Sequence, residues 1–273
     1  MKTRSIVVLL TSMLLVVAAT RRVASAVQEP AKALHGTVSS FKIGDFSAFV
    51  MTPDRNVPVN APARWVWFFP ANFFTAPPPG AGSESAQYAN GWLDAGYYLV
   101  GIDLGFTGGS PASMKLFDEF YRQIMSRYAF TPRARMFLGS RGGLEAYGFA
   151  ERYPERVARI GGIYPVSDWR NWPGVDALPL SPPETAFTAD DLKNADVLNP
   201  IQNLKPMVAA GIEVLTLHGD RDVTVSLDAN ARAFTDRYRA LGGNATMILL
   251  PAVGHDVSGI FRQELVDFLL GGK

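Results

Sequence analysis

Residues 135–144 constrain the fold of this chain more than any other stretch. A short β-prone segment, residues 136–138, is followed at once by Ser140 between small residues and then by a helix-forming run. This order is typical of a sharp strand-to-helix turn that holds one hydroxyl in an exposed, strained position. The glycines after the serine favour such a turn because side chains there would collide with the neighbouring strand. The pattern predicts a nucleophile at Ser140, which then needs a base, an acid and an oxyanion-binding site elsewhere.

Strand-like and helix-like segments alternate along the rest of the chain. Such alternation predicts a doubly wound, mostly parallel α/β sheet of about eight strands with helices on both faces. With no cysteine, the fold must be stabilised by packing rather than by disulfides. We expect strands at residues 35–41, 46–52, 64–69, 97–103, 136–138, 157–164, 213–217 and 246–250, and helices at 85–95, 112–128, 141–152, 189–198, 227–241 and 259–269.

The N-terminus has the pattern of a targeting segment. A basic start precedes an apolar run, residues 6–19, that is too short for a comfortable membrane span, and a small-residue motif ends at Ala26. We predict a signal peptide over residues 1–26, cleaved after Ala26 or alternatively after Ala19, and export to the periplasm or the medium. A retained N-terminal anchor is the other alternative. After cleavage one domain, residues 27–273, is left without a membrane span.

The charge pattern excludes a nucleic-acid surface. The whole chain carries +1, but residues 1–26 hold four of the 26 basic side chains and none of the 25 acidic ones, so the remainder carries −3. Basic and acidic residues are interspersed, with no basic block. Three scattered histidines and no cysteine argue against a zinc site, and the glycine-rich run 105–109 lacks the phosphate-loop pattern. We therefore expect no metal, no cofactor and no nucleic-acid partner.

Two later loops carry the residues that a serine nucleophile needs. Asp222 follows the predicted strand 213–217, and His255 follows the predicted strand 246–250. Because the carboxyl ends of parallel strands meet at one edge of a sheet, we expect Ser140, Asp222 and His255 to lie together. An imidazole can accept the serine proton, and a carboxylate fixes its tautomer and stabilises its charged form.

Two other histidines are candidates for the base, and one other aspartate is a candidate for the acid. His35 lies in an N-terminal strand, and His218 directly precedes the acid loop, where it would support that loop; His255 is therefore the predicted base. Asp168 follows another predicted strand and is a rival acid. We favour Asp222 because its Gly-x-x-Asp-x-x-Val loop is the more specific pattern.

Together these motifs resemble the α/β-hydrolase superfamily, in the chain order serine, acid, histidine. The likeness extends over roughly residues 34–270 and is strongest to a bacterial, esterase-like branch of serine hydrolases. It implies an α/β-hydrolase fold, with residues 27–273 as the catalytic domain and a short lid insertion, about residues 167–211, that leaves the site partly open. The motifs that carry the resemblance are Ser140-Arg141-Gly142-Gly143, His218-Gly219-x-x-Asp222-x-x-Val225 and Gly254-His255.

The elbow departs from the family pattern at Leu138, where the family has a small residue two positions before the serine. With Ser140 at the tip of the turn, the strand must repack locally around this leucine. A frame shifted by one would put Arg141 at the tip, leaving no nucleophile and a non-catalytic scaffold. We favour Ser140 because the Gly-Gly pair after Ser-x matches the branch.

The resemblance also implies an oxyanion hole made of two backbone N–H groups. One belongs to Arg141, and the other to Ala71 or Asn72 in the loop after residues 64–69. The Arg141 side chain either binds an anionic or polar substrate group or is an ordinary surface arginine.

Several side chains on the predicted loops are candidates for lining the substrate pocket, because such pockets combine apolar walls with a few polar groups. Asp168, Trp169 and Trp172, at the start of the predicted insertion, could instead simply cap a turn. The candidates are Phe73, Phe106, Asp168, Trp169 and Trp172.

We therefore predict an exported, carboxylesterase-like serine hydrolase that cleaves small-molecule or glycan esters through an acyl-enzyme. A peptidase or amidase with the same triad is one alternative, and a non-catalytic binding protein on the same fold is another. The sequence leaves the acyl and alcohol specificity and the oligomeric state open.

Overall fold

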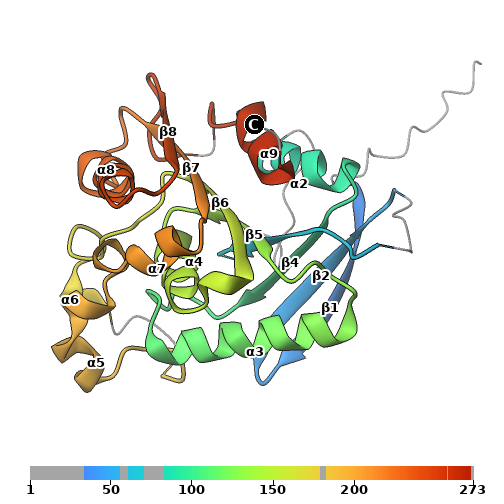
Figure 1. Ribbon diagram of the computed structural model, residues 1–273, viewed down its shortest axis with the longest axis horizontal. Coiled ribbons are helices and arrows are strands. Elements are labelled where there is room, and N and C mark those ends of the chain that lie inside the picture. The colour runs from blue at the N-terminus through green and yellow to red at the C-terminus, as the bar shows by residue number, and fades with distance from the viewer. Residues whose placement is uncertain (1–33, 56–60, 71–82, 179–182, 257, 272–273) are drawn as a thin grey trace, which may run out of the picture. The chain divides into compact units, whose positions relative to one another are not determined.

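The apolar segments build a single sheet in the computed structural model, which describes residues 34–55, 61–70, 83–178, 183–256 and 258–271 (Figure 1). In these residues eight strands follow the order β1-β2-β4-β3-β5-β6-β7-β8 across the sheet. The strands are β1 (Gly36–Ile43), β2 (Phe46–Pro53), β3 (Trp65–Phe69), β4 (Tyr98–Asp103), β5 (Ala134–Gly139), β6 (Val157–Ile163), β7 (Glu213–Gly219) and β8 (Ala245–Leu250).

Strand direction divides this sheet into two parts. β1 and β2 form an antiparallel hairpin, and β2 also pairs antiparallel with β4. From β4 through β3, β5, β6 and β7 to β8, every pairing is parallel. The carboxyl ends of β3 to β8 therefore lie at the same edge of the sheet, which is where ligands bind in open α/β sheets.

Helices cover both faces of the sheet. α2 and α9 pack together on one face, while α3, α4, α7 and α8 lie on the other. The helices are α2 (Glu84–Asp94), α3 (Pro111–Arg127), α4 (Gly142–Arg152), α5 (Ala189–Lys193), α6 (Ala195–Leu198), α7 (Lys205–Ala209), α8 (Ala233–Ala240) and α9 (Gln263–Leu270), with 3₁₀ turns at Pro154–Arg156, Val175–Ala177 and Pro200–Gln202. This arrangement confirms the predicted doubly wound α/β fold.

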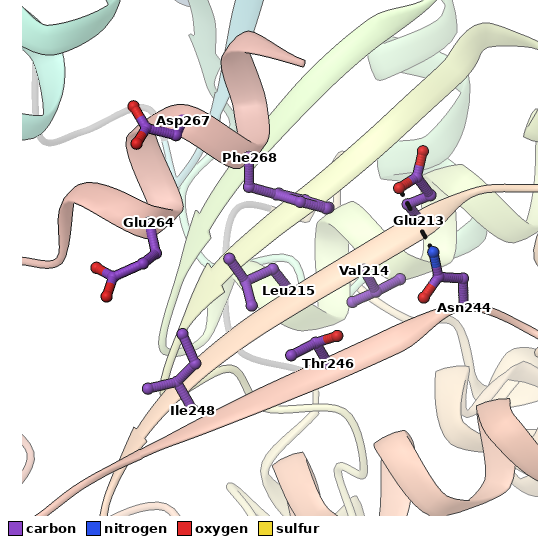
Figure 2. Close-up of a pocket in the computed structure, with 9 residues that line it drawn as sticks. All are labelled: Glu213, Val214, Leu215, Asn244, Thr246, Ile248, Glu264, Asp267 and Phe268. Carbon is purple, nitrogen blue, oxygen red and sulfur yellow. Dashed lines mark hydrogen bonds between the residues drawn. The ribbon is translucent and has the colours of Figure 1, made fainter. Parts of the chain in front are cut away.

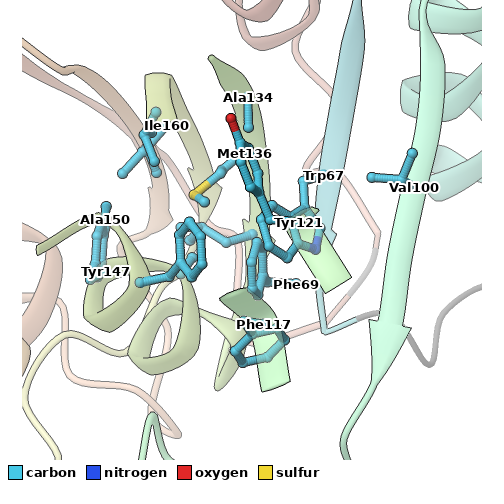
Figure 3. Close-up of a cluster of buried hydrophobic side chains, with 14 of the residues drawn as sticks. Trp67, Phe69, Val100, Phe117, Tyr121, Ala134, Met136, Tyr147, Ala150 and Ile160 are labelled. Carbon is cyan, nitrogen blue, oxygen red and sulfur yellow. The ribbon is translucent and has the colours of Figure 1, made fainter. Parts of the chain in front are cut away.

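β3 shows how sequence alternation produces the two-sided core. Its five residues are all buried, and Trp65, Trp67 and Phe69 point to the α3 and α4 side. Val66 and Phe68 point to the α2 and α9 side. In Figure 3, Trp67 and Phe69 lie among the side chains of α3 and α4. Burying a large apolar side chain contributes about 2–3 kcal/mol, so this strand anchors both layers.

Three predicted helices differ from the structure. Residues 189–198 form two short helices rather than one, because Thr188 and Asp191 make a capping box at α5 and the chain breaks at Asn194. The segment predicted as helix 227–241 begins with a π-helical turn, Asp228–Arg232, before α8. The last helix starts at Gln263 rather than at residue 259, and α7 was not predicted.

The predicted signal peptide, residues 1–26, lies outside the described residues. Among those that are described, no helix is both long and apolar enough to cross a membrane.

Candidate active site

The chain turns sharply at Ser140, between β5 and α4. The φ angle of Ser140 is 49°, a left-handed conformation that a non-glycine residue rarely adopts. Three backbone hydrogen bonds hold it: Ser140 N–H donates to the Ile163 carbonyl at 3.0 Å, and the Ser140 carbonyl accepts from Gly143 at 3.0 Å and from Val166 at 2.9 Å. The turn thus presents the serine side chain at the carboxyl edge of the sheet.

The two glycines after the elbow are required by close backbone contacts. A Cβ atom on Gly142 would lie 2.3 Å from the Phe69 carbonyl oxygen, and one on Gly143 would lie 2.3 Å from the Val166 carbonyl oxygen. Neither backbone atom can move out of the way as a flexible side chain could. The Gly-Gly pair therefore allows α4 to start directly against the ends of two strands.

Leu138 is accommodated by a glycine on the neighbouring strand. The leucine is fully buried, and its Cδ1 occupies the space beside Gly162 on β6, where a Cβ atom would be only 2.6 Å away. Arg141 has right-handed helical backbone angles, φ −54° and ψ −27°. The left-handed tip of the turn is therefore Ser140, as in the favoured frame, and not Arg141.

Ser140, His255 and Asp222 form a continuous chain of hydrogen bonds. Ser140 Oγ lies 2.9 Å from His255 Nε2, and His255 Nδ1 lies 2.7 Å from Asp222 Oδ2. Because a carboxylate only accepts, Nδ1 carries the proton and Nε2 is left to accept the serine hydroxyl hydrogen. This is the arrangement in which an imidazole can act as general base toward a serine.

Each fixed position of the acid loop has a physical reason. Asp222 Oδ1 accepts from the backbone N–H groups of Thr224 at 2.9 Å and Val225 at 2.8 Å, which curls the loop around the carboxylate. Buried His218 donates from Nε2 to the Val225 carbonyl at 3.0 Å and lies 3.4 Å from Asp222 Oδ2. Gly219 is needed because a Cβ atom there would lie 2.1 Å from the Val253 carbonyl oxygen.

These contacts keep the Asp222 carboxylate ionised. Burial alone would raise its pKa, but hydrogen bonds from His218, His255 and the Val225 N–H outweigh burial and hold the pKa well below its ordinary value. The Asp222 side chain is fully enclosed, whereas that of His255 remains 17% exposed. A charged acid behind a partly accessible imidazole is suited to stabilising imidazolium during a reaction.

Tyr164 is a site residue that the sequence analysis did not assign. Its ring centroid lies 4.2 Å from that of His255, and its N–H donates to the Leu217 carbonyl at 2.7 Å. Its φ of 37° is also left-handed. Tyr164 therefore packs against the imidazole and restricts its orientation. Its place directly after β6, at the same edge as Ser140, was the available signal.

Asp168, the rival acid, belongs to the insertion rather than to the histidine. Its carboxylate accepts from Arg170 Nε at 3.0 Å, Asn171 Nδ2 at 3.0 Å and Asn199 Nδ2 at 2.7 Å. Burial opposes ionisation of Asp168, yet these bonds lower its pKa overall. Trp169 is fully buried and packs edge-on against Phe187 at 5.0 Å. Asp168 and Trp169 therefore pack within the insertion, and a place for them in the wall of a substrate pocket stays a prediction.

Phe106 and Trp172 do meet at the catalytic edge. Their ring centroids are 5.4 Å apart, and the Arg141 guanidinium lies 5.2 Å from the centre of the Phe106 ring. The three side chains come from the loop after β4, the elbow, and the insertion. They form a partly exposed cluster that includes Arg141, the residue next to Ser140 in the chain.

Glu145 is a second residue that sequence reasoning missed. It lies one turn after Arg141 in α4, is 2% exposed, and accepts from the Thr107 N–H at 3.2 Å and the Thr107 hydroxyl at 3.0 Å. Burial raises the pKa of Glu145 to about 7, against the opposing effects of Arg141 and Thr107. The acid therefore fixes the loop that carries Phe106.

The candidate oxyanion donors are only partly described. Arg141 stands at the start of α4, where backbone N–H groups lack acceptors within the helix. Ala71, Asn72 and the pocket candidate Phe73 lie outside the described residues. No group of three histidine, cysteine, aspartate or glutamate side chains in the described part of the chain is arranged to hold a metal ion.

A cavity of about 440 Å³ lies away from this site, between α9 and strands β7 and β8, and most of its strand residues are in the amino-terminal halves of those strands. Leu215, Ile248 and Phe268 form its apolar surface, and Glu264 and Asp267 lie along α9 (Figure 2). Asp222 and His255 follow the carboxyl ends of these two strands, so the cavity lies toward the opposite end of the strands from these residues.

Comparison with known proteins assigns the family. The model of the prolyl oligopeptidase family matches residues 119–269, just over half of the chain and including Ser140, Asp222 and His255. The chain belongs to the prolyl oligopeptidase family. This membership agrees with the α/β-hydrolase architecture and with the serine, histidine and aspartate that the structure brings together. A comparison with curated proteins finds no match.

This member of the prolyl oligopeptidase family also shares its fold with solved structures. It matches an S-formylglutathione hydrolase from Agrobacterium tumefaciens with a TM-score of 0.66 and 16% identity, over 88% of this chain and 95% of that one. It matches a Mycobacterium tuberculosis puromycin-hydrolyzing peptidase with a TM-score of 0.65 and 12% identity, over 89% of this chain. The chain spans 41% of that peptidase and 35% of a matched chain from Bacteroides ovatus. At such low identities the likeness establishes the fold alone.

Proposed function

We propose that the chain is a carboxylic-ester hydrolase that works through an acyl-enzyme formed on Ser140. The hydroxyl attacks the ester carbonyl carbon while its proton passes to His255 Nε2, and Asp222 stabilises the resulting imidazolium. The Arg141 N–H and a second donor from Ala71 or Asn72 stabilise the oxyanion. Collapse of this intermediate breaks the ester bond, and His255 returns the proton to the departing alcohol.

The second half of the reaction reverses these roles. Water attacks the acyl carbon as its proton passes to His255, and collapse releases the acid while Ser140 recovers its proton. The observation that carries the proposal is the pair of distances, 2.9 Å from Ser140 Oγ to His255 Nε2 and 2.7 Å from His255 Nδ1 to Asp222 Oδ2. It is supported by the strained φ of 49° at Ser140.

Ester cleavage is the first candidate because solved structures of the same fold include an S-formylglutathione hydrolase and a thermostable esterase. A peptidase or amidase remains the second candidate because the family model is that of prolyl oligopeptidases. The same serine and histidine would serve both reactions, since an amide differs chiefly in needing its leaving amine protonated.

We further propose that the hydrolase is exported. The support is in the sequence, where residues 1–26 combine a basic start, an apolar run and a small-residue motif ending at Ala26. N-terminal sequencing of the mature protein from its native host tests this; a mature chain that still begins at Met1 would contradict it.

A fluorophosphonate probe and two chromogenic substrates test the function. The wild type should label and should cleave 4-nitrophenyl butyrate faster than an aminoacyl 4-nitroanilide. Ser140→Ala should abolish labelling and lower kcat by about 10⁴–10⁶-fold. Ser126→Ala, which changes an exposed serine on α3, is the matched control and should behave as the wild type. Full esterase activity in Ser140→Ala would refute the proposal, and faster anilide cleavage would favour the peptidase.

A further inference from the structure

The side chain that follows the nucleophile provides a charged feature that the proposed reaction does not use. We propose that Arg141, stacked on Phe106, forms an anion subsite that selects ester substrates carrying a carboxylate. The inference rests on the proposed esterase function and names the substrate class of the same site.

The first argument is position. Arg141 directly follows Ser140, so its side chain and the reacting hydroxyl project from adjacent residues of one rigid turn. The guanidinium lies 5.2 Å from the centre of the Phe106 ring, and that ring packs against Trp172 at 5.4 Å. Stacking on a ring restrains the arginine without using its N–H donors, which stay available for a ligand.

The second argument concerns ion pairing: within the described residues no carboxylate forms a direct ion pair with Arg141. Arg170 in the insertion contrasts with it, because Arg170 pairs with Asp168 at 2.9 Å and with Asp196 at 3.4 Å. A half-buried guanidinium without a carboxylate has a planar pair of donors that matches the two oxygens of a substrate carboxylate.

The nearby acid attracts Arg141 without forming a direct ion pair with it in the described residues. The Arg141 charge opposes the rise that burial causes in the pKa of Glu145, and the Oε1 of Glu145 accepts both hydrogen bonds from Thr107. This arrangement holds the Phe106 loop in place beneath the arginine. In addition, Arg141 stands at the amino end of α4, an eleven-residue helix whose dipole adds positive potential at the same place.

A substrate carboxylate could reach Arg141 from either side of the scissile bond. It could belong to the acyl group, as in a half-ester of a dicarboxylic acid, or to the leaving alcohol. Three substrates separate these cases: neutral 4-nitrophenyl butyrate, 4-nitrophenyl hemiglutarate with the charge on the acyl side, and 3-carboxy-4-nitrophenyl butyrate with the charge on the leaving group.

The test is the ratio of kcat/KM for a charged ester to kcat/KM for the neutral ester. In Arg141→Gln this ratio should fall about tenfold or more for one charged substrate, the size expected for a charge-assisted hydrogen bond. Arg141→Lys should retain part of it. Arg122→Gln, which removes a 65% exposed arginine on α3, is the matched control and should leave the ratio unchanged. In the wild type the ratio should also decrease with added salt, because screening weakens charge attraction.

The outcomes separate the two proposals. If the wild type cleaves the neutral ester but Arg141→Gln lowers both classes of substrate equally, the anion subsite is wrong and the esterase proposal stands. If the wild type cleaves no ester while labelling normally, the esterase proposal fails and the subsite fails with it. Thermal melting of each variant identifies any that fail to fold. If Arg141→Gln fails to fold, the ratio of kcat/KM is compared between the wild type and Arg141→Lys instead.

Discussion

Replacing Glu145 by glutamine should make the protein's stability less dependent on pH. The wild-type side chain is 2% exposed, and its burial raises the pKa from an ordinary 4.5 to about 7. Glutamine keeps an oxygen that can accept from the Thr107 N–H and hydroxyl, but it has no charge to bury. The substitution therefore isolates the free energy of ionising a buried acid.

The sign follows from proton binding. Between pH 4.5 and about 7 the folded chain keeps the Glu145 proton that the unfolded chain has lost, so wild-type stability falls as pH rises through this window. The rise of the pKa from 4.5 to about 7 corresponds to about 3 kcal/mol. Nearby Arg141 and Asp103 also act on Glu145, with opposite signs, and their net effect is contained in the shifted pKa.

Urea unfolding followed by tryptophan fluorescence measures this difference. The free energy of unfolding of Glu145→Gln, minus that of the wild type, should increase by about 3 kcal/mol between pH 4.5 and pH 8. Titration of all other groups largely cancels in this difference. Glu119→Gln, which removes an exposed carboxylate on α3, is the control and should show a change of less than about 0.5 kcal/mol. A difference for Glu145→Gln that does not vary with pH, or that decreases as pH rises, would refute the reasoning.

Two further predictions concern the acid and the elbow. Asp222→Asn should lower kcat for ester cleavage by about 10³–10⁴-fold, whereas Asp168→Asn should mainly lower the melting temperature; equal losses of kcat would mean that the acid is misassigned. Gly143→Ala should destabilise the fold by about 2 kcal/mol or more, because its Cβ atom would lie 2.3 Å from the Val166 carbonyl oxygen, and an unchanged urea midpoint would show that the elbow has more room than the structure indicates.

The fold and the order of the candidate triad could be predicted because both depend on interactions between residues that are close in the sequence. An apolar strand followed by Ser140 and two glycines describes one turn, and the acid loop fixes Asp222 through hydrogen bonds to residues within three positions of it. These contacts depend on short stretches of sequence, so a pattern of a few residues is enough to indicate them.

What was missed depends on residues that are distant in the sequence. The space for Leu138 comes from Gly162 across the β5–β6 pairing, whose register the sequence does not state. Glu145 is buried because Thr107, 38 residues earlier, lies over it. Such partners are chosen by sheet register and loop packing, and a charged residue on a helix gives no local sign that it is enclosed.

Three non-glycine residues at the catalytic edge, Ser140, Tyr164 and Ala252, have left-handed backbone angles, and the first two follow neighbouring strands. Ser140 and Tyr164 both have left-handed backbone angles, φ 49° and 37°, and each directly follows one of two paired strands. Left-handed non-glycine residues cost about 1–3 kcal/mol each, so they persist only where neighbouring structure enforces them. Two backbone hydrogen bonds hold these angles, from the Ser140 N–H to the Ile163 carbonyl and from the Tyr164 N–H to the Leu217 carbonyl. The same bonds orient Ser140 and the Tyr164 ring relative to His255. The strain at Ser140 and Tyr164 is therefore supported by the sheet rather than by flexible loops. The hydroxyl and the imidazole are thereby held in position before any substrate binds.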